Sequence, residues 1–192
     1  MPTAEGLSDP GAGGKGGCAI AVRNIVVRSL SPSRTTGRLV CGNLILPCSL
    51  GRSGIRSTKR EGDGATPRGR FRFESAFYRP DLLSRPRTGL GLCATRPNDG
   101  WCDAAADRNY NRRVQHPYPA SAEHLWRKDD LYDVVVVIDY NRRPRRRAAG
   151  SAIFMHVAQR GLKPTEGCVA LSRSDLLKVM ARIGPRTRIT IV

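Results

Sequence analysis

No uninterrupted run of apolar residues in the chain is longer than residues 134–138, which are four valines and one isoleucine. This run is far shorter than the roughly 18 residues that a membrane-spanning helix requires. β-Branched side chains favour extended backbone, and a short apolar run without alternation is typical of a strand buried on both faces. We therefore expect a fully buried strand over residues 133–140, a core organised around a sheet, and no transmembrane segment.

Further segments have the composition of strands. Residues 19–30 and 38–46 are rich in Val, Ile and Leu, and the Ser-Pro-Ser sequence between them predicts a hairpin. The alternating segment 71–74 predicts a half-buried strand, the apolar segment 151–157 a further strand, and residues 187–192 a terminal strand. The sequence thus predicts a mainly β fold.

One segment has the spacing of a helix. Apolar residues recur at helical intervals from Leu176 to Ile183, with Ser172 at the expected N-cap and Asp175 three residues after it. A Gly-Pro pair at residues 184–185 ends the segment. We expect one clear helix near the C-terminus, directly after the turn that contains Cys168.

The chain has the length of a single domain, with 192 residues and a mass of 21.0 kDa. Residues 1–17 contain six glycines, two prolines and few apolar side chains, which predicts a flexible tail before a domain over residues 18–192. Residues 80–123 are dense in Pro, Gly, Asn and Arg. We expect a long irregular stretch there, of the kind that forms lids or binding surfaces.

The formal net charge is +17, from 33 basic and 16 acidic residues, and arginine supplies most of the basic ones. Such a charge attracts polyanions, including nucleic acid, anionic lipid and acidic polymers. Residues 142–147 contain five arginines in six positions. The proline within this run and the lack of interleaved aromatic residues favour a solvated loop over a base-stacking surface.

The spacing of the cysteines and the composition of the first residues indicate the cellular compartment. The six cysteines are widely spaced, with no C-x-x-C pair, so most of them are expected to be buried, reduced thiols. The first residues lack the basic and apolar regions of a secretory signal, so the sequence as written does not support export.

A histidine and a cysteine lie close together in the most informative segment. His156 follows Ile-Phe-Met on an expected strand, and Cys168 follows Gly167 at an expected turn. A thiol with an ordinary pKa near 8.5 is about 3% thiolate at pH 7, and a neighbouring imidazole increases its reactivity. Gly167 gives a substrate access to the backbone, where amides can stabilise an oxyanion. The pattern therefore indicates nucleophilic acyl transfer, with a structural role for both residues as the alternative.

Two motifs resemble those of the L,D-transpeptidase (YkuD-like) family. The family motif places a histidine on a strand before Ser/Thr-x-Gly-Cys and a hydrophobic residue, and residues 165–171 (TEGCVAL) fit it. A second stretch, Lys59 followed by residues 62–71 (GDGATPRGRF), is similar to the family's Gly-x-x-Thr-Pro-x-Gly-x-Phe turn and strand. The resemblance covers residues 18–192 and implies a β-rich sandwich with the catalytic cysteine at its rim.

The resemblance also implies a reaction. Cys168 would attack the third stem residue of a peptidoglycan tetrapeptide and release D-Ala, with His156 as base and the amides of Gly167 and Cys168 as oxyanion donors. A neighbouring amine would then form a 3→3 crosslink or an anchor, while water would make the site an L,D-carboxypeptidase. The family needs no metal or organic cofactor and implies a location in the periplasm or cell envelope.

One position departs from the family pattern. Ala170 stands where the family usually has arginine, so Arg173 or Arg112 is a candidate replacement at the substrate. Thr165 and Tyr110 are further candidate substrate contacts. Within residues 99–112, Trp101 is either buried in a structured loop or part of the substrate surface, and Cys102 is not the expected nucleophile.

Two alternatives to the enzyme remain open at this stage. One is a basic binding module for nucleic acid or an anionic polymer, although nucleic acid is not the favoured partner. The other is a degenerate member that binds wall peptides without catalysis, suggested by Ala170. The sequence makes no prediction about the oligomeric state.

Overall fold

The computed structural model describes residues 21–31 and 35–192, so the tail predicted for residues 1–17 lies outside the described residues. Strands dominate this part of the chain, with one α-helix and a single 3-10 turn, η1 (Asp130–Tyr132). None of the helices within these ranges is long and apolar enough to cross a membrane. The strands and the α-helix are β1 (Asn24–Ser29), β2 (Thr36–Cys41), β3 (Leu44–Ser49), β4 (Ile55–Arg56), β5 (Thr66–Pro67), β6 (Gly69–Tyr78), β7 (Leu92–Ala94), β8 (Asp99–Cys102), β9 (Arg112–Gln115), β10 (Ala122–His124), β11 (Val134–Ile138), β12 (Phe154–Val157), β13 (Val169–Leu171), α1 (Arg173–Met180) and β14 (Arg188–Ile191).

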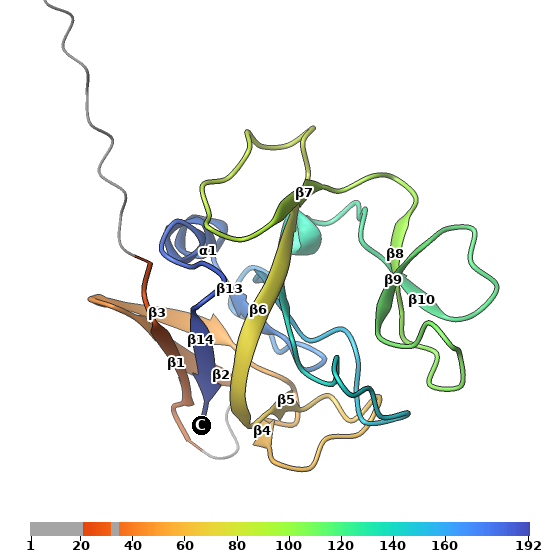
Figure 1. Cartoon of the computed structure of the whole chain (residues 1–192). Coiled ribbons are helices and arrows are strands. Elements are labelled where there is room, and N and C mark those ends of the chain that lie inside the picture. Colours follow the sequence, from red (N-terminus) through yellow and green to blue (C-terminus); the bar gives the residue numbers. More distant parts are fainter. Residues whose placement is uncertain (1–20, 32–34) are drawn as a thin grey trace, which may run out of the picture.

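The main sheet closes on itself through its longest strand. Its order is β11-β12-β13-β3-β2-β1-β14-β6-β7, and β6 pairs a second time with β11. Residues 69–72 of β6 pair with β14, whereas residues 73–78 pair with β11. In Figure 1, β6 runs through the centre of the molecule with β1 and β14 on one side of it. The predicted mainly β fold with one C-terminal helix is confirmed.

The predicted N-terminal hairpin is present, but one of its strands divides. β1 and β2 pair antiparallel from Ile25↔Cys41 to Ser29↔Gly37, and the connection at residues 32–34 lies outside the described residues. The prediction of one strand over residues 38–46 is wrong. Gly42 adopts a φ of +60°, which lets the chain reverse at a two-residue turn so that β2 and β3 form a second hairpin.

The strand predicted over residues 133–140 is β11, and it is buried on both faces. Val134, Val136 and Ile138 belong to the main core, which the closed sheet encloses together with α1. Val135 and Val137 face the opposite way into a second cluster that includes Phe154 of β12. This second face of β11 and β12 carries the candidate site.

Helix α1 starts where the sequence indicates, because the Ser172 hydroxyl accepts a hydrogen bond from the Asp175 amide at 3.2 Å. Leu176, Val179 and Met180 are buried by this helix. The helix ends at Met180, three residues before Ile183, although Ile183 remains in the core. The chain then turns into β14, which pairs in parallel with β1.

The stretch expected to be irregular, residues 80–123, contains ordered strands. β7 extends the main sheet, and β10-β8-β9 form a small sheet at one side of the molecule (Figure 1). Asp99 organises this small sheet, since its buried carboxylate accepts hydrogen bonds from Arg113 at 2.6 Å and from the Arg96 amide at 2.8 Å. These strands are too short and polar to produce an alternating pattern, which explains why the sequence did not predict them.

Candidate active site

A tight turn with a glycine at positive φ presents Cys168. Gly167 has a φ of +130°, and a Cβ atom at this position would lie 2.6 Å from the carbonyl oxygen of Ala65. Thr165 ties the turn together, because its Oγ1 accepts from the Gly167 amide at 3.2 Å and donates to the Cys168 carbonyl at 2.7 Å. Only glycine fits this position without displacing the cysteine.

The two sequence motifs meet at this turn. Thr165 forms a parallel bridge with Gly51, and its amide donates to the Leu50 carbonyl at 2.9 Å. The Gly51 amide in turn donates to Thr66 Oγ1 of the second motif at 2.8 Å. The segment around Gly51 therefore joins the Thr-Pro turn to the cysteine turn, which gives the second motif a structural role at the site.

Two backbone groups hold the Cys168 sulfur. The Phe154 amide donates to Sγ at 3.3 Å, and the thiol donates to the Ala152 carbonyl at 3.2 Å. Burial raises the pKa of the Cys168 thiol to about 12, and the nearby Glu123 carboxylate adds to this shift while the Phe154 amide opposes it. The resting group is therefore a neutral thiol with an amide already directed at its sulfur.

His156 lies on the same face of the sheet as this sulfur. His156 pairs with Val135 of β11, and Phe154, two residues earlier on β12, belongs with Val135 and Cys168 to the same side-chain cluster. The imidazole Nδ1 lies 2.8 Å from the Val157 carbonyl oxygen, which only accepts, so Nδ1 carries the proton and Nε2 is the basic nitrogen. Burial lowers the pKa of His156 to about 4, so the ring is neutral at pH 7.

Cys168 and His156 line one cavity of about 540 Å³. Charged residues of both signs surround it, and several are already paired: Lys59 contacts Asp63 at 2.7 Å, and Glu166 contacts Arg52 at 2.8 Å. Among the described residues, no group of three or more His, Cys, Asp or Glu side chains is arranged to hold a metal ion. The lining residues are Lys59, Glu61, Gly62, Asp103, Glu123, Arg127, Leu131, Tyr132, Ser151, Ala152, His156, Gln159, Lys163, Pro164, Thr165, Glu166 and Cys168.

A tyrosine–glutamate pair completes the wall beside the histidine. The Tyr132 hydroxyl donates to Glu123 at 2.6 Å, and its ring meets the His156 ring edge-on at a centroid distance of 5.3 Å. Burial raises the pKa of Glu123, and the negative charge of Asp103 adds to the shift. Sequence reasoning missed both members of this pair. The one available signal was the polar stretch ending at Glu123, which was expected to form a lid or a binding surface.

The other predicted substrate contacts, Tyr110, Arg112 and Arg173, do not line the cavity, although Tyr110 bonds to Glu61 of its lining. Tyr110 is buried, donates its hydroxyl proton to Glu61, and accepts from the Gly150 amide at 3.0 Å. Arg112 is exposed on β9, and Arg173 pairs with the buried Asp133. Of the predicted site residues, the described cavity lining includes Thr165, His156 and Cys168, but not Gly167, Tyr110, Arg112 or Arg173.

The residue that replaces the usual arginine is part of the sheet. Ala170 is buried in β13 between His156 of β12 and Ser49 of β3. The cations that line the described cavity are Lys59, Arg127 and Lys163, from three other segments. A cationic group at this site therefore comes from elsewhere in the chain than position 170.

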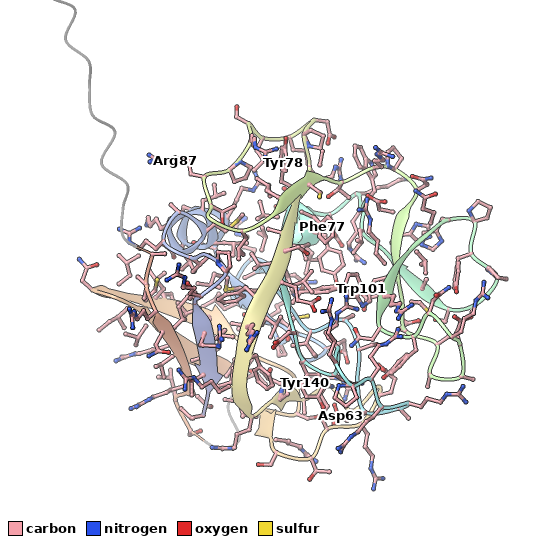
Figure 2. The ribbon with its side chains drawn as sticks, in the orientation of Figure 1. Asp63, Phe77, Tyr78, Arg87, Trp101 and Tyr140 are labelled. Carbon is pink, nitrogen blue, oxygen red and sulfur yellow. The ribbon has the colours of Figure 1, made fainter. Side chains whose placement is uncertain are left out.

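Trp101 and two arginines of the run at residues 142–147 make structural contacts behind the cavity. The buried Trp101 indole donates to Asn111 at 3.0 Å and meets Phe154 edge-on at 5.0 Å. Figure 2 shows Phe77 and Trp101 on the side of β6 that faces the small sheet. Arg142 lies over the Trp101 ring at 4.8 Å and pairs with Glu74 at 2.8 Å, while Arg145 donates to the Tyr110 carbonyl. These two arginines support the wall behind the site.

The remaining described cysteines differ from Cys168 in position. Cys41, Cys48 and Cys102 are buried free thiols outside the cavity lining, and Cys93 is exposed. Burial raises the pKa of Cys102. Among the described residues, Cys168 is thus the cysteine that shares a cavity with a histidine.

Three comparisons with known proteins bear on the family of this chain. A family model described as the L,D-transpeptidase catalytic domain (YkuD) matches residues 33–191. Two solved structures are similar: an L,D-transpeptidase from Mycobacterium tuberculosis H37Rv, with 15% identity and a TM-score of 0.41, and L,D-transpeptidase 1 of Mycobacterium tuberculosis, with 12% identity and a TM-score of 0.38. Each similarity covers 88% of this chain, which spans 57% and 62% of those two chains. A search of curated proteins gave no match.

Proposed function

This chain belongs to the family of L,D-transpeptidase (YkuD) catalytic domains, and from that membership we propose that it is a cysteine-dependent L,D-transpeptidase acting on peptidoglycan stem peptides. The observation that carries the proposal is the shared cavity of Cys168 and His156. A neutral imidazole with a basic Nε2 and a thiol held by a backbone amide are the two groups that acyl transfer needs.

In the first half-reaction, the Cys168 sulfur attacks the carbonyl carbon of the third stem residue. His156 accepts the thiol proton as the S–C bond forms, because the resting thiol is protonated at pH 7. The Phe154 amide, already 3.3 Å from Sγ, stabilises negative charge on the sulfur. The bond to the terminal D-Ala then breaks, and His156 returns the proton to the leaving amine. The products are an acyl-thioester and free D-Ala.

Backbone amides of the turn stabilise the tetrahedral intermediate. We assign this role to the amides of Gly167 and Cys168. The Gly167 amide makes only a long 3.2 Å bond with the Thr165 hydroxyl, which a developing oxyanion can replace. Thr165 holds the turn through the Cys168 carbonyl and acts as a positioning residue.

In the second half-reaction, an acceptor resolves the thioester. An amine from a neighbouring stem gives a 3→3 crosslink, and an amine on an attached protein gives an anchor. Water gives a tripeptide, which is the carboxypeptidase outcome. Since this substrate lies outside the cytoplasmic membrane, we propose that the protein works in the periplasm or cell envelope.

Intact-protein mass spectrometry with a tetrapeptide muropeptide tests the proposal. We expect an adduct of the donor minus D-Ala on Cys168, together with free D-Ala in solution. Cys168→Ala should give neither, and His156→Gln should form the adduct at least about a hundredfold more slowly, as expected for loss of a general base.

Cys93→Ser is the matched control, because Cys93 is an exposed thiol outside the described cavity lining. This variant should react like the parent. Turnover by Cys168→Ala at the parental rate would refute the assignment of the nucleophile. Tight muropeptide binding by the parent with neither adduct nor released D-Ala would identify a non-catalytic wall-peptide binder instead.

A further inference from the structure

One face of the main sheet points away from the core and is covered with arginine. Along β1, β2, β14 and the first half of β6, even-numbered residues point outward while odd-numbered residues are buried or face inward. The strand pairings keep the outward residues in register. We call this surface the arginine face. Its arginines, with one directly before β1 and one two residues before β14, are Arg23, Arg28, Arg38, Arg70, Arg72, Arg186 and Arg188.

The arrangement places like charges directly opposite one another. Arg28 pairs across the strands with Arg38, and Arg188 pairs with Arg72. Like charges in such cross-strand positions destabilise a sheet. Among the described residues, none of the seven arginines of this face forms an ion pair with a carboxylate. The face therefore carries positive charge that the described part of the fold does not neutralise.

A depression of about 440 Å³ lies within the arginine face. Four guanidinium groups, from Arg23, Arg70, Arg186 and Arg188, line it together with Asn24. The Asn24 side chain accepts a hydrogen bond from Arg70 at 3.2 Å, which orients that guanidinium. Several guanidinium groups without a neighbouring carboxylate suit a phosphate, which they bind bidentately.

Aliphatic side chains stand beside these charges. Val26, Val40 and Ile45 form one cross-strand row on the same side of the sheet, and Ile45 is 64% exposed. Leu30, at the end of β1, is 53% exposed. A surface that combines exposed aliphatic groups with unpaired arginines matches an anionic bilayer surface, where phosphates lie just above acyl chains.

We propose that the arginine face docks the protein on an anionic lipid bilayer, with headgroup phosphates in the depression lined by Arg70 and Arg188. A bilayer fits better than nucleic acid, because the outward residues of these strands include no aromatic side chain for base stacking. None of the residues that line the depression lines the catalytic cavity, so docking leaves the cavity wall free for substrate.

Vesicle co-sedimentation tests this proposal. The protein is mixed with vesicles of phosphatidylcholine alone or of phosphatidylcholine and phosphatidylglycerol, at about 0.1 M salt. Each basic residue near such a surface contributes about fivefold to partitioning. We therefore expect the parent to bind to the anionic vesicles only. A variant without four of these arginines, called the face variant, should bind them about a hundredfold or more weakly. The face variant carries Arg28→Gln, Arg38→Gln, Arg72→Gln and Arg188→Gln.

A control variant removes four exposed arginines from other surfaces, so it has the same net charge as the face variant. Figure 2 shows one of them, Arg87, projecting away from the sheet. The control should keep most of the binding, and Ile45→Ser should weaken it with no change in charge. The control variant is Arg85→Gln, Arg87→Gln, Arg146→Gln and Arg147→Gln.

The variants also separate docking from folding. Since the face variant loses two like-charge pairs, its unfolding midpoint should equal or exceed that of the parent while its vesicle binding is lost. Equal losses in the face and control variants would overturn the proposal in favour of a net-charge effect. Equal binding to neutral vesicles would overturn it as well, as would tighter binding to duplex DNA than to anionic vesicles through the same four arginines.

Discussion

The resting state of Cys168 can be tested by its reaction with a small neutral electrophile such as iodoacetamide. Because the thiol is buried and its pKa is raised to about 12, only about one molecule in 100,000 carries a thiolate at pH 7. This fraction grows tenfold for each pH unit. The rate of Cys168 alkylation should therefore rise about a thousandfold between pH 7 and pH 10, without a plateau.

The assay follows modification by peptide mass spectrometry, which resolves Cys168 from the exposed Cys93 in the same sample. A rate that is constant between pH 6 and pH 9, or that levels off with an apparent pKa near 7, would refute the reasoning. That result would mean that thiol and imidazole rest as a thiolate–imidazolium pair. The expected result means that His156 removes the proton during attack on the substrate.

The same assay tests the neighbouring carboxylate. Glu123 raises the pKa of the Cys168 thiol through its charge, and glutamine keeps the shape of the side chain and an oxygen that accepts from Tyr132. Glu123→Gln should therefore alkylate severalfold faster than the parent at any fixed pH in this range. An unchanged or slower rate would show that Glu123 exerts no field on the sulfur.

Three further predictions concern stability. The pKa of His156 is 6.5 in the unfolded chain and about 4 in the folded one, so the unfolded state takes up a proton first as the pH falls. About 3 kcal/mol of the free energy of unfolding is therefore present above pH 6.5 and lost as the pH falls through 4. Urea unfolding of His156→Gln should show a smaller loss of stability over the same pH range. Gly167→Ala places a Cβ atom against the Ala65 carbonyl at a positive φ. It should lower the free energy of unfolding by about 3 kcal/mol or more and abolish acylation of Cys168. Gly161→Ala, at a φ of +81° with no atom within 4 Å, should cost only about 1 kcal/mol in thermal unfolding. Arg173→Ala removes the ion-pair partner of the fully buried Asp133 and should cost about 2 kcal/mol of stability, a value discounted for the exposure of Arg173. The KM for a muropeptide should stay unchanged. A raised KM at parental stability would favour a substrate role for Arg173.

Local signals in the sequence were sufficient for part of the site. His156 stands on an apolar strand and Cys168 at a glycine turn of a contiguous segment, so spacing and residue type predict them together. The fold class was equally accessible, because β11 is a continuous run of β-branched residues whereas α1 has apolar residues at helical spacing. The β2–β3 turn was missed because the residues on both sides of Gly42 have the composition of strands, and one glycine within such a pattern does not by itself predict a turn.

Long-range contacts account for what the sequence did not predict. Tyr132 meets His156, and Glu123 accepts from Tyr132, only because η1 leads into β11 and β10 pairs with β8. The ion pair of Arg173 with Asp133 spans forty residues and has no periodic signature. Likewise, the arginine face depends on the order β2-β1-β14-β6, which joins the two ends of the domain. Composition shows the charge, but only strand pairing concentrates it on one surface.

The distribution of charge leads to a last prediction about salt. The cavity lining contains three cations and four carboxylates, and Lys59, Arg127 and Glu166 are already paired with Asp63, Asp129 and Arg52. The net charge of +17 therefore lies largely outside the cavity, where exposed charges are screened by salt. Raising the salt from about 0.1 M to about 0.5 M should change kcat/KM for a soluble muropeptide by less than about threefold, while it releases the protein from anionic vesicles. A fall of kcat/KM in parallel with vesicle release would instead mean that the arginines attract the soluble substrate itself, and the face variant would then lose activity on it as well.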